Sequence, residues 1–377
     1  MSDMSPQQVI QMNAQMRAML LSTAPEFEKN LGTFTELVVG RSTRIKLANV
    51  GIITKLVIDV TAQVAITVAV ATPSTKAPWN LINRIRVSDY DGSDRVNMSG
   101  FQLFILACRR RKMYYGFNND VATATFVNPK IPTAIATDNI QFLLEIPLAF
   151  DVDNSIVQLR DLRGAVLAQT ATGEMYLTID WNPSLYANGD VDSVYSAGGS
   201  TIALAANGIQ CTVYQHYLLP QAIGPNGQLP LPQVDLMTVY ELIGNIRSSD
   251  NLAVNSEKLL NYPNVRSVIG FYINYVQNGT LQAAKINLFK LVANANNILK
   301  ERTERKMLLE MRMLLNGDLI AGSYFMDHTA KPIETALFGN VQLSLTPNTV
   351  GGANYVEFGY ESFYTKGMAL PGTNQGS

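Results

Sequence analysis

The chain has 377 residues, of which 47% are hydrophobic and 16% are charged, so it is not a disordered chain and has enough apolar material for two packed domains. Lysine and arginine number 29 and the acidic residues number 30, which gives a formal net charge of −1. A near-neutral chain lacks the overall basic field that direct nucleic-acid binding needs.

Cysteine content and hydropathy argue against two further classes, disulfide-rich proteins and helical membrane proteins. The two cysteines, Cys108 and Cys211, are too few for a disulfide framework and fit a reducing compartment. The most apolar region, residues 50–71, is interrupted by Lys55 and Asp59, so no membrane-spanning helix is expected there.

The first predicted element is an amphipathic helix over residues 6–24. Apolar side chains recur there at helical spacing, whereas Gln7, Gln11 and Gln15 fall elsewhere around the helix. The residues expected to face a membrane or a partner are Val9, Met12, Met16, Arg17, Met19 and Leu20. The pattern fits equally a helix packed on its own domain.

Beyond residue 25 the apolar period changes to two. Leu56, Ile58 and Val60 share one face of a strand, and Lys55 and Asp59 lie on the other. Such alternation indicates antiparallel strands packed on one face, and tight turns are expected at the pairs 91–92, 188–189, 207–208, 226–227 and 278–279. The predicted class is all-β with a few helices.

Two stretches interrupt the strand pattern. The small, polar and Gly-rich segment 182–208 predicts an exposed loop with a mobile tip. Residues 219–234 hold four prolines and two glycines, which predicts a domain boundary. The expected organisation is a helical arm at 1–25, a first unit at 26–220, a linker at 221–234, a second unit at 235–366 and a tail at 367–377.

The second unit repeats features of the first. Phe271, Ile273 and Tyr275 repeat the phase of the strand around Ile58. A helix-like run follows a strand in each half, at 99–113 and at 297–315. The second run has an apolar stripe made by Met307, Leu308, Met311, Leu314 and Leu315. Both observations indicate two copies of one unit.

Candidate chemical motifs favour structural roles. The run 89–94 (DYDGSD) places its glycine wrongly for a calcium loop and predicts a hairpin turn. A basic run at a helix end favours contact with solvent or a neighbouring subunit over phosphate binding. That run consists of Arg109, Arg110, Arg111 and Lys112. His216 and His328 lack any catalytic context, so no enzyme activity, cofactor or metal is predicted.

Six segments, in order along the chain, resemble the major capsid protein of tectiviruses. They are IPLAF (146–150), GAVLA (164–168), TVYQHYL (212–218), NGQLPLPQVDL (226–236), KPIETALFGNV (331–341) and GYESFY (359–364). The chain departs from the family in the loop lengths around 110–138 and 246–262.

The resemblance implies a double jelly roll, with two eight-stranded jelly rolls in tandem and an architecture related to the adenovirus hexon. It implies pseudo-hexagonal homotrimers that tile an icosahedral shell around a lipid membrane and double-stranded DNA. The implied partners are neighbouring trimers, penton and minor capsid proteins, and the internal membrane near helix 6–24. The implied location is the virion capsid, with assembly in the host cytoplasm.

Two other classes remain as alternatives. A trimeric vertex spike or receptor-binding protein shares the β-rich fold. An outer-membrane β-barrel requires an export signal, which we do not expect at this N-terminus because its most apolar stretch, residues 19–21, is too short.

Overall fold

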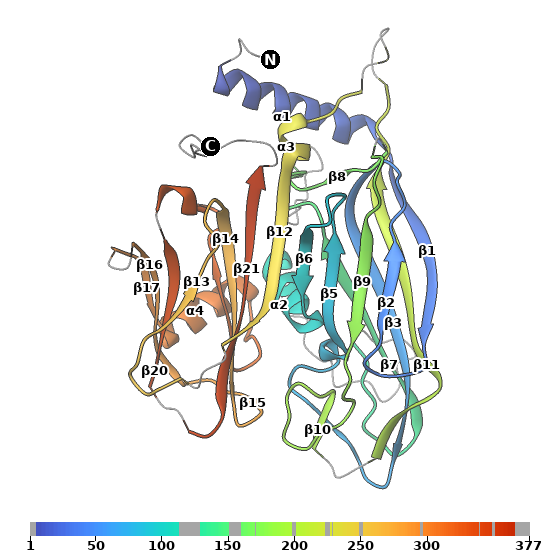
Figure 1. The fold of residues 1–377 in the computed structure, drawn as a ribbon, viewed down its shortest axis with the longest axis vertical. Coiled ribbons are helices and arrows are strands. Elements are labelled where there is room, and N and C mark those ends of the chain that lie inside the picture. The colour runs from blue at the N-terminus through green and yellow to red at the C-terminus, as the bar shows by residue number, and fades with distance from the viewer. Residues whose placement is uncertain are drawn as a thin grey trace, which may run out of the picture.

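The computed structural model of the protein forms two β-sandwiches that stand side by side, with a helix across one end (Figure 1). The structure describes residues 5–112, 129–150, 160–169, 171–197, 201–222, 227, 229–248, 252–294, 297–338, 340–348 and 351–365. The predicted tail at 367–377 lies outside these ranges.

The first sandwich consists of two four-stranded layers. One layer has the order β1 (Glu26–Glu36), β11 (Thr201–Leu218), β3 (Ile52–Thr67) and β7 (Thr137–Pro147), with β8 (Val166–Leu167) on β3. The other has the order β2 (Ser42–Lys46), β9 (Tyr176–Trp181), β5 (Ile82–Ser88) and β6 (Asp94–Met98). β4 (Thr72–Pro73) and β10 (Tyr195–Ala197) form a separate ribbon.

The second sandwich repeats the first strand for strand. Its layers are β12 (Thr238–Arg247), β21 (Asn354–Thr365), β14 (Ser267–Gln277) and β18 (Ser323–Asp327), facing β13 (Lys258–Asn261), β20 (Val341–Pro347), β16 (Ile286–Ala293) and β17 (Asn297–Thr303). β15 (Thr280–Leu281) and β19 (Ile333–Glu334) flank β14. Both units are therefore eight-stranded jelly rolls, as the resemblance to tectivirus capsid proteins implies. That they divide at 221–234 into independent domains stays a prediction.

The strand phase predicted from the sequence is confirmed in both rolls. Leu56, Ile58 and Val60 are completely buried, and their partners across the sandwich are apolar too. Phe271, Ile273 and Tyr275 are completely buried, and the residues between them are buried too. Contacts therefore decide the phase of β14: Phe271 packs on Tyr262 of its own roll, whereas Tyr272 meets Arg109 on the other side. Each roll therefore has a core filled from the inward face of its third strand.

One sheet runs through both rolls. β12 pairs in parallel with β6, through Leu242 with Val96 and Ile243 with Asn97, although the other strand pairings of this sheet are antiparallel. The result is a ten-stranded sheet that includes strands of both sandwiches. Backbone hydrogen bonds thus join the two rolls, in addition to side-chain packing.

Four α-helices accompany the described strands. They are α1 (Pro6–Thr23), α2 (Gly100–Arg111), α3 (Gln233–Met237) and α4 (Glu304–Leu315), and the short 3-10 turns are η1 (Trp79–Leu81) and η3 (Thr335–Leu337). The prediction of a helix over 297–315 is wrong in its first part, because 297–303 pairs as β17 with β16. The Thr303 side chain caps α4 by accepting a hydrogen bond from the Lys306 amide, at 3.4 Å.

Two loop predictions have opposite outcomes. The 89–94 run is a hairpin turn between β5 and β6, with Gly92 at φ 81°. The segment 182–208 is not simply an exposed loop, because Val191, Val194 and Tyr195 are buried and β11 already begins at Thr201. Internal hydrogen bonds to carbonyl oxygens of this segment, including one from Asn80 Nδ2 to Ser193 at 2.7 Å, allow this polar segment to fold inward. Its tip, 198–200, lies outside the described residues.

Candidate assembly surfaces

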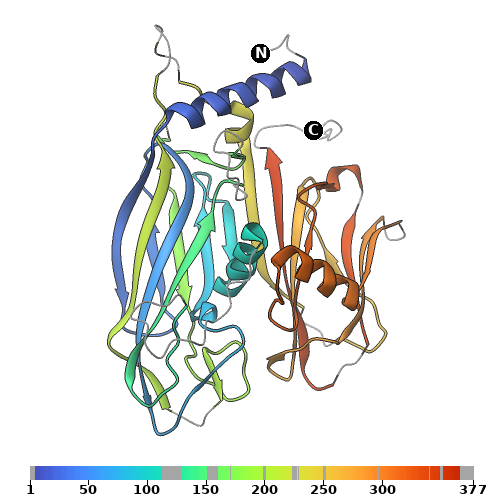
Figure 2. The same ribbon diagram turned by 180° about the vertical axis from the view of Figure 1, so that it is seen from behind.

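Helix α2 lies between the two jelly rolls (Figure 2). Towards the first roll, Phe104 stacks on Trp79 with ring centroids 4.6 Å apart. Towards the second, Gln102 packs so closely on β12 that a Cβ atom at Gly244 would meet its Oε1 at 2.2 Å. A side chain at that position would have to displace the Gln102 amide, so α2 packs closely on β12 at the interface between the rolls.

Arg109 crosses from α2 into the second roll and enters a buried network. Its guanidinium pairs with Asp327 and with Glu361, whose side chain is 0% exposed, and its Nε donates to the Tyr272 hydroxyl at 3.1 Å. The Tyr272 and Tyr240 hydroxyls also donate to Glu361. A buried carboxylate needs this set of donors, so the cation of the first roll satisfies the acid of the second.

The predicted surface role of the basic run is therefore wrong for Arg109 and Arg110. Both are buried within the single subunit, and the Arg110 guanidinium lies 5.9 Å from the centroid of the Tyr240 ring. Arg111 and Lys112 are exposed, and Arg111 pairs with Glu145 at 2.7 Å. A contact between subunits at Arg111 and Lys112 stays a prediction.

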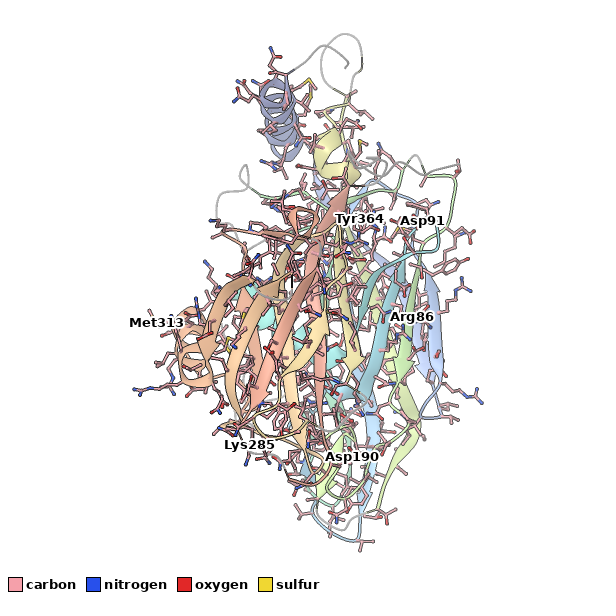
Figure 3. The ribbon with its side chains drawn as sticks, turned by 60° about the vertical axis from the view of Figure 1, so that its left-hand side comes forward. Arg86, Asp91, Asp190, Lys285, Met313 and Tyr364 are labelled. Carbon is pink, nitrogen blue, oxygen red and sulfur yellow. The ribbon has the colours of Figure 1, made fainter. Side chains whose placement is uncertain are left out.

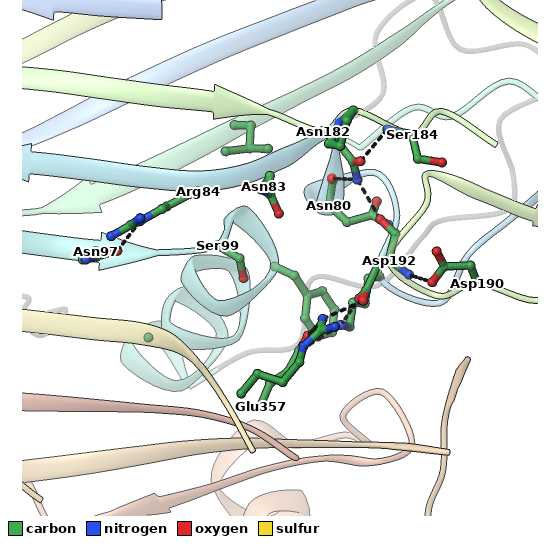
Figure 4. A pocket seen from close by; sticks show the side chains of 16 residues that line it. Asn80, Asn83, Arg84, Asn97, Ser99, Asn182, Ser184, Asp190, Asp192 and Glu357 are labelled. Atoms are coloured by element: carbon green, nitrogen blue, oxygen red, sulfur yellow. Dashed lines mark hydrogen bonds and ion pairs between the residues drawn. The ribbon is translucent and has the colours of Figure 1, made fainter. Parts of the chain in front are cut away.

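A second charged cluster joins the rolls at a pocket of about 540 Å³ (Figure 4). Lys76 from the first roll donates to Asp192 at 2.7 Å and to Glu357 of the second roll at 2.8 Å. Arg247 reaches the same carboxylates at 2.6 and 3.1 Å. Burial alone would raise the pKa of Asp192, but the two cations outweigh it and lower that pKa to about 2.

The middle of helix α1, from Asn13 to Arg17, is held by polar contacts to α3. Asn13 Nδ2 donates to Asp235 at 2.8 Å, the Val234 amide donates to Asn13 Oδ1 at 2.9 Å, and Arg17 pairs with Asp235 at 3.2 Å. Burial raises the pKa of Asp235, against the opposing effects of Asn13 and Arg17. Asn13 cannot be recognised from the sequence, because an asparagine in an amphipathic helix gives no signal of a partner 222 residues away.

The C-terminal half of α1 packs on the first roll. Leu20 and Leu21 are buried in a cluster with Ile52 and Leu162, so the prediction that Leu20 faces a membrane or partner is wrong. The remaining predicted residues are half-buried or exposed: Val9, Met12, Met16 and Arg17 are half-buried, and Met19 is exposed. Their contact with a membrane or partner stays a prediction.

The described residues contain no His, Cys, Asp and Glu grouping suited to a metal ion. Cys108 and Cys211 are both buried. Among the helices that the structure describes, none is long and apolar enough to cross a membrane.

Comparisons with known proteins agree with this architecture. Residues 4–221 match the family model described as P3 major capsid protein N-terminal, and residues 237–374 match the one described as P3 major capsid protein C-terminal. The major capsid protein P3 of Enterobacteria phage PRD1 is 27% identical over 383 residues, covering 96% of this chain and 93% of the relative.

Solved structures share the fold at lower identity. A structure of Sulfolobus Turreted Icosahedral Virus superposes with a TM-score of 0.65 and 15% identity, covering 90% of this chain and 91% of the other. The major capsid protein P2 of Bacteriophage PM2 gives a TM-score of 0.52 and 11% identity, covering 91% and 99%. With both halves of the chain matched, the protein belongs to the P3 major capsid protein family and is a structural subunit of a viral capsid shell, not an enzyme.

Proposed function

We propose that three copies of this chain form a pseudo-hexagonal trimer that tiles the facets of an icosahedral shell. The observation that carries the proposal is the strand-for-strand repetition of one jelly roll by the next, with the two standing side by side. Three such subunits supply six equivalent units around one axis, and closed cyclic symmetry is the usual form of homo-oligomers.

Native mass spectrometry and light scattering of the purified protein test the trimer. We expect a particle of three times the subunit mass at micromolar concentration. A monomer or dimer as the stable species would contradict the trimer. Electron microscopy of virions tests the placement: the subunit should cover the facets, whereas density confined to the vertices would favour a spike.

We also propose that the end carrying α1 faces the inside of the shell, near an internal lipid membrane. Met12, Met16 and Met19 lie along one side of this helix and are not fully buried, and thioether side chains adapt to irregular apolar surfaces. Arg17 is the only cation of the helix and is paired with Asp235, so the contact must rest on apolar burial and many copies.

Paired charge variants on α1 test the membrane contact. Met12→Glu with Met19→Glu should leave soluble trimers but lower the yield of membrane-containing particles. Gln7→Glu with Ala14→Glu adds the same charge to exposed positions on the opposite side of the helix and is the matched control. Equal particle yields from the two double variants would contradict the membrane-facing role.

Further partners follow from the same proposal. A shell of such trimers requires a different protein at its fivefold vertices, so penton and minor capsid proteins are the expected additional partners, and the host cytoplasm is the expected place of assembly. Affinity purification of subunits from infected cells, with cross-linking at defined times, tests both expectations. Recovery of the subunit alone at all times would contradict them.

A further inference from the structure

The pocket of about 540 Å³ between the rolls has the size and the position of a small-molecule site. Ligand pockets usually enclose roughly 300–1,000 Å³ and occur preferentially between domains. Its walls come from η1, β5 and the turn after β9 in the first roll, and from β12 and β21 in the second. Asp190, one of the lining residues, lies towards the end of the molecule opposite α1 (Figure 3). A molecule bound in this pocket would touch both rolls.

The charges that line the pocket cancel. Four of them neutralise one another directly, because Lys76 and Arg247 both pair with Asp192 and with Glu357. The remaining two charged side chains are one base and one acid, Arg84 and Asp190. The lining therefore has no excess charge with which to attract an anion or a cation.

The lining is more polar than that of an ordinary ligand pocket. Most small-molecule sites are mainly apolar and carry a few polar groups. Here only Ile82, Phe101, Pro183 and Gly244 lack a polar side chain among the residues that line the pocket. A lipid or an aromatic molecule would leave the polar groups without partners, which costs free energy. The pocket therefore suits a ligand whose own surface is mostly polar and uncharged.

Hydrogen bonds hold the amide side chains of the wall in place. Asn182 Nδ2 donates to the Asn80 carbonyl oxygen at 2.7 Å, and Asn182 Oδ1 accepts from the Ser184 amide at 2.8 Å. Asn97 Oδ1 accepts from Arg84 Nε at 2.7 Å (Figure 4). Side chains that are already fixed lose little freedom when a ligand binds, so the wall is preorganised.

Three half-buried side chains of the wall keep unused hydrogen-bonding atoms. Within the described part of the chain, the terminal nitrogens of Arg84, the hydroxyl of Ser184 and Oδ2 of Asp190 have no partner. Arg84 and Asp190 lie on opposite sides of the pocket (Figure 4). The pocket thus offers donors on one side and an acceptor on the other. Hydroxyl groups both donate and accept, so a molecule with several of them can use both sides at once.

We propose that this pocket binds a neutral saccharide, with Arg84 donating to its hydroxyl oxygens and Asp190 accepting from its hydroxyl groups. The site does not depend on the proposed trimer, because all the residues that line it belong to one subunit. Each site binds weakly, since it buries little apolar surface. Many copies on one shell bind a glycan-covered surface much more strongly than one copy does.

Saturation-transfer NMR of the full-length protein tests the site with neutral disaccharides built from glucose, galactose, mannose and N-acetylglucosamine. We expect saturable binding of at least one of them at millimolar concentration, with an affinity that is insensitive to ionic strength because the ligand is uncharged. Ser184→Trp should weaken this binding by at least ~10-fold, because the indole fills the pocket. Ser256→Trp is the matched control at an exposed serine of the second roll outside the pocket, and it should retain wild-type affinity.

Two further substitutions test the class of ligand without adding bulk. Arg84→Met removes the spare donors and should weaken disaccharide binding by at least ~10-fold, whereas Arg84→Lys keeps a donor and should recover part of the affinity. Asp190→Asn should weaken it by less than ~10-fold, because an amide oxygen still accepts from a hydroxyl group.

The zwitterion diglycine is the competing probe, since its carboxylate and ammonium groups could pair with Arg84 and Asp190. Binding of diglycine but of no disaccharide, with the binding lost in Asp190→Asn, would overturn the saccharide class. No binding of any disaccharide, or equal affinity of the wild type and Ser184→Trp, would overturn the site.

Discussion

The third strands of the two jelly rolls, β3 and β14, differ in how far the rest of the subunit buries their outward-facing side chains. Along β3, buried residues alternate with half-buried ones, so only one side of its sheet is sealed within the subunit. Along β14, every residue after Ser267 is buried. The second roll therefore depends on the first to cover its outward side, whereas the described residues give the first roll less cover on the corresponding side.

This asymmetry explains where the subunit places buried charge. The outward side of the second roll carries Glu361, which would face water in an isolated roll and is instead sealed by α2 and paired with Arg109. On α4, Arg312 pairs with Asp318 in the open, as an ordinary surface ion pair. An arginine near the end of each helix thus makes a buried contact between the rolls in one case and a solvent-exposed ion pair in the other.

The largest expected effect comes from removing the interdomain cation. Arg109→Met should cost about 3 to 5 kcal/mol in the free energy of unfolding, because Glu361 is left buried without its positive partner. Arg312→Met on α4 is the control and should cost under about 0.5 kcal/mol, because the pair that it breaks is exposed. Denaturant unfolding at fixed protein concentration measures both, and equal losses would show that burial does not distinguish the two arginines.

Core truncation compares the two rolls directly. Phe271→Ala should cost about 4 kcal/mol and Leu56→Ala about 3 kcal/mol, because each removes a completely buried side chain from its own core. If the rolls form separate cores, each variant should first unfold the roll that carries it, which hydrogen exchange can localise. Losses well below about 1 kcal/mol would contradict the assigned strand phase.

The two histidines, one in each roll, should make different contributions to the pH dependence of stability at acid pH. Burial lowers the pKa of His328 in the second roll to about 3, and Lys300 acts in the same direction. The unfolded chain then binds the proton that the folded chain does not, so stability falls as the pH drops below the ordinary value of about 6.5. Between pH 7 and 4.5 this loss should reach about 2.5 kcal/mol for the single group.

His328→Gln should therefore flatten the pH dependence of unfolding over that range. His216→Gln in the first roll is the control: burial also lowers the pKa of His216, but this side chain is partly exposed and lies 3.2 Å from Glu28. His216→Gln should therefore change the pH dependence of unfolding less than His328→Gln does. Identical pH profiles for wild type and His328→Gln would show that this histidine protonates freely in the folded protein.

The sequence predicts well what depends on local periodicity and poorly what depends on distant partners. The period-two pattern around Ile58 identifies a strand and its buried face without any tertiary information. The burial of Arg109 follows from Glu361, which lies 252 residues away, so a run of four basic residues looks like a surface feature. The strand at 297–303 has a sequence that also suits a helix, and only pairing with β16 decides the outcome.

The smallest expected effect concerns the helices that precede each roll. α1 leads into β1 and α3 leads into β12, and the two helices are joined by Asn13 and Asp235. Asn13→Ala removes one donor from the buried Asp235 and leaves the Val234 amide without its acceptor. We expect a loss of about 1 to 2 kcal/mol, confined to the N-terminal half of α1, because Leu20 still anchors the other half. Hydrogen exchange of the α1 amides measures this release, with the exposed substitution Gln15→Ala as the control. Faster exchange before residue 16 only in Asn13→Ala would confirm that the Asn13 contact fixes the helix, whereas equal protection in both variants would show that Arg17, Leu20 and Leu21 hold it without Asn13.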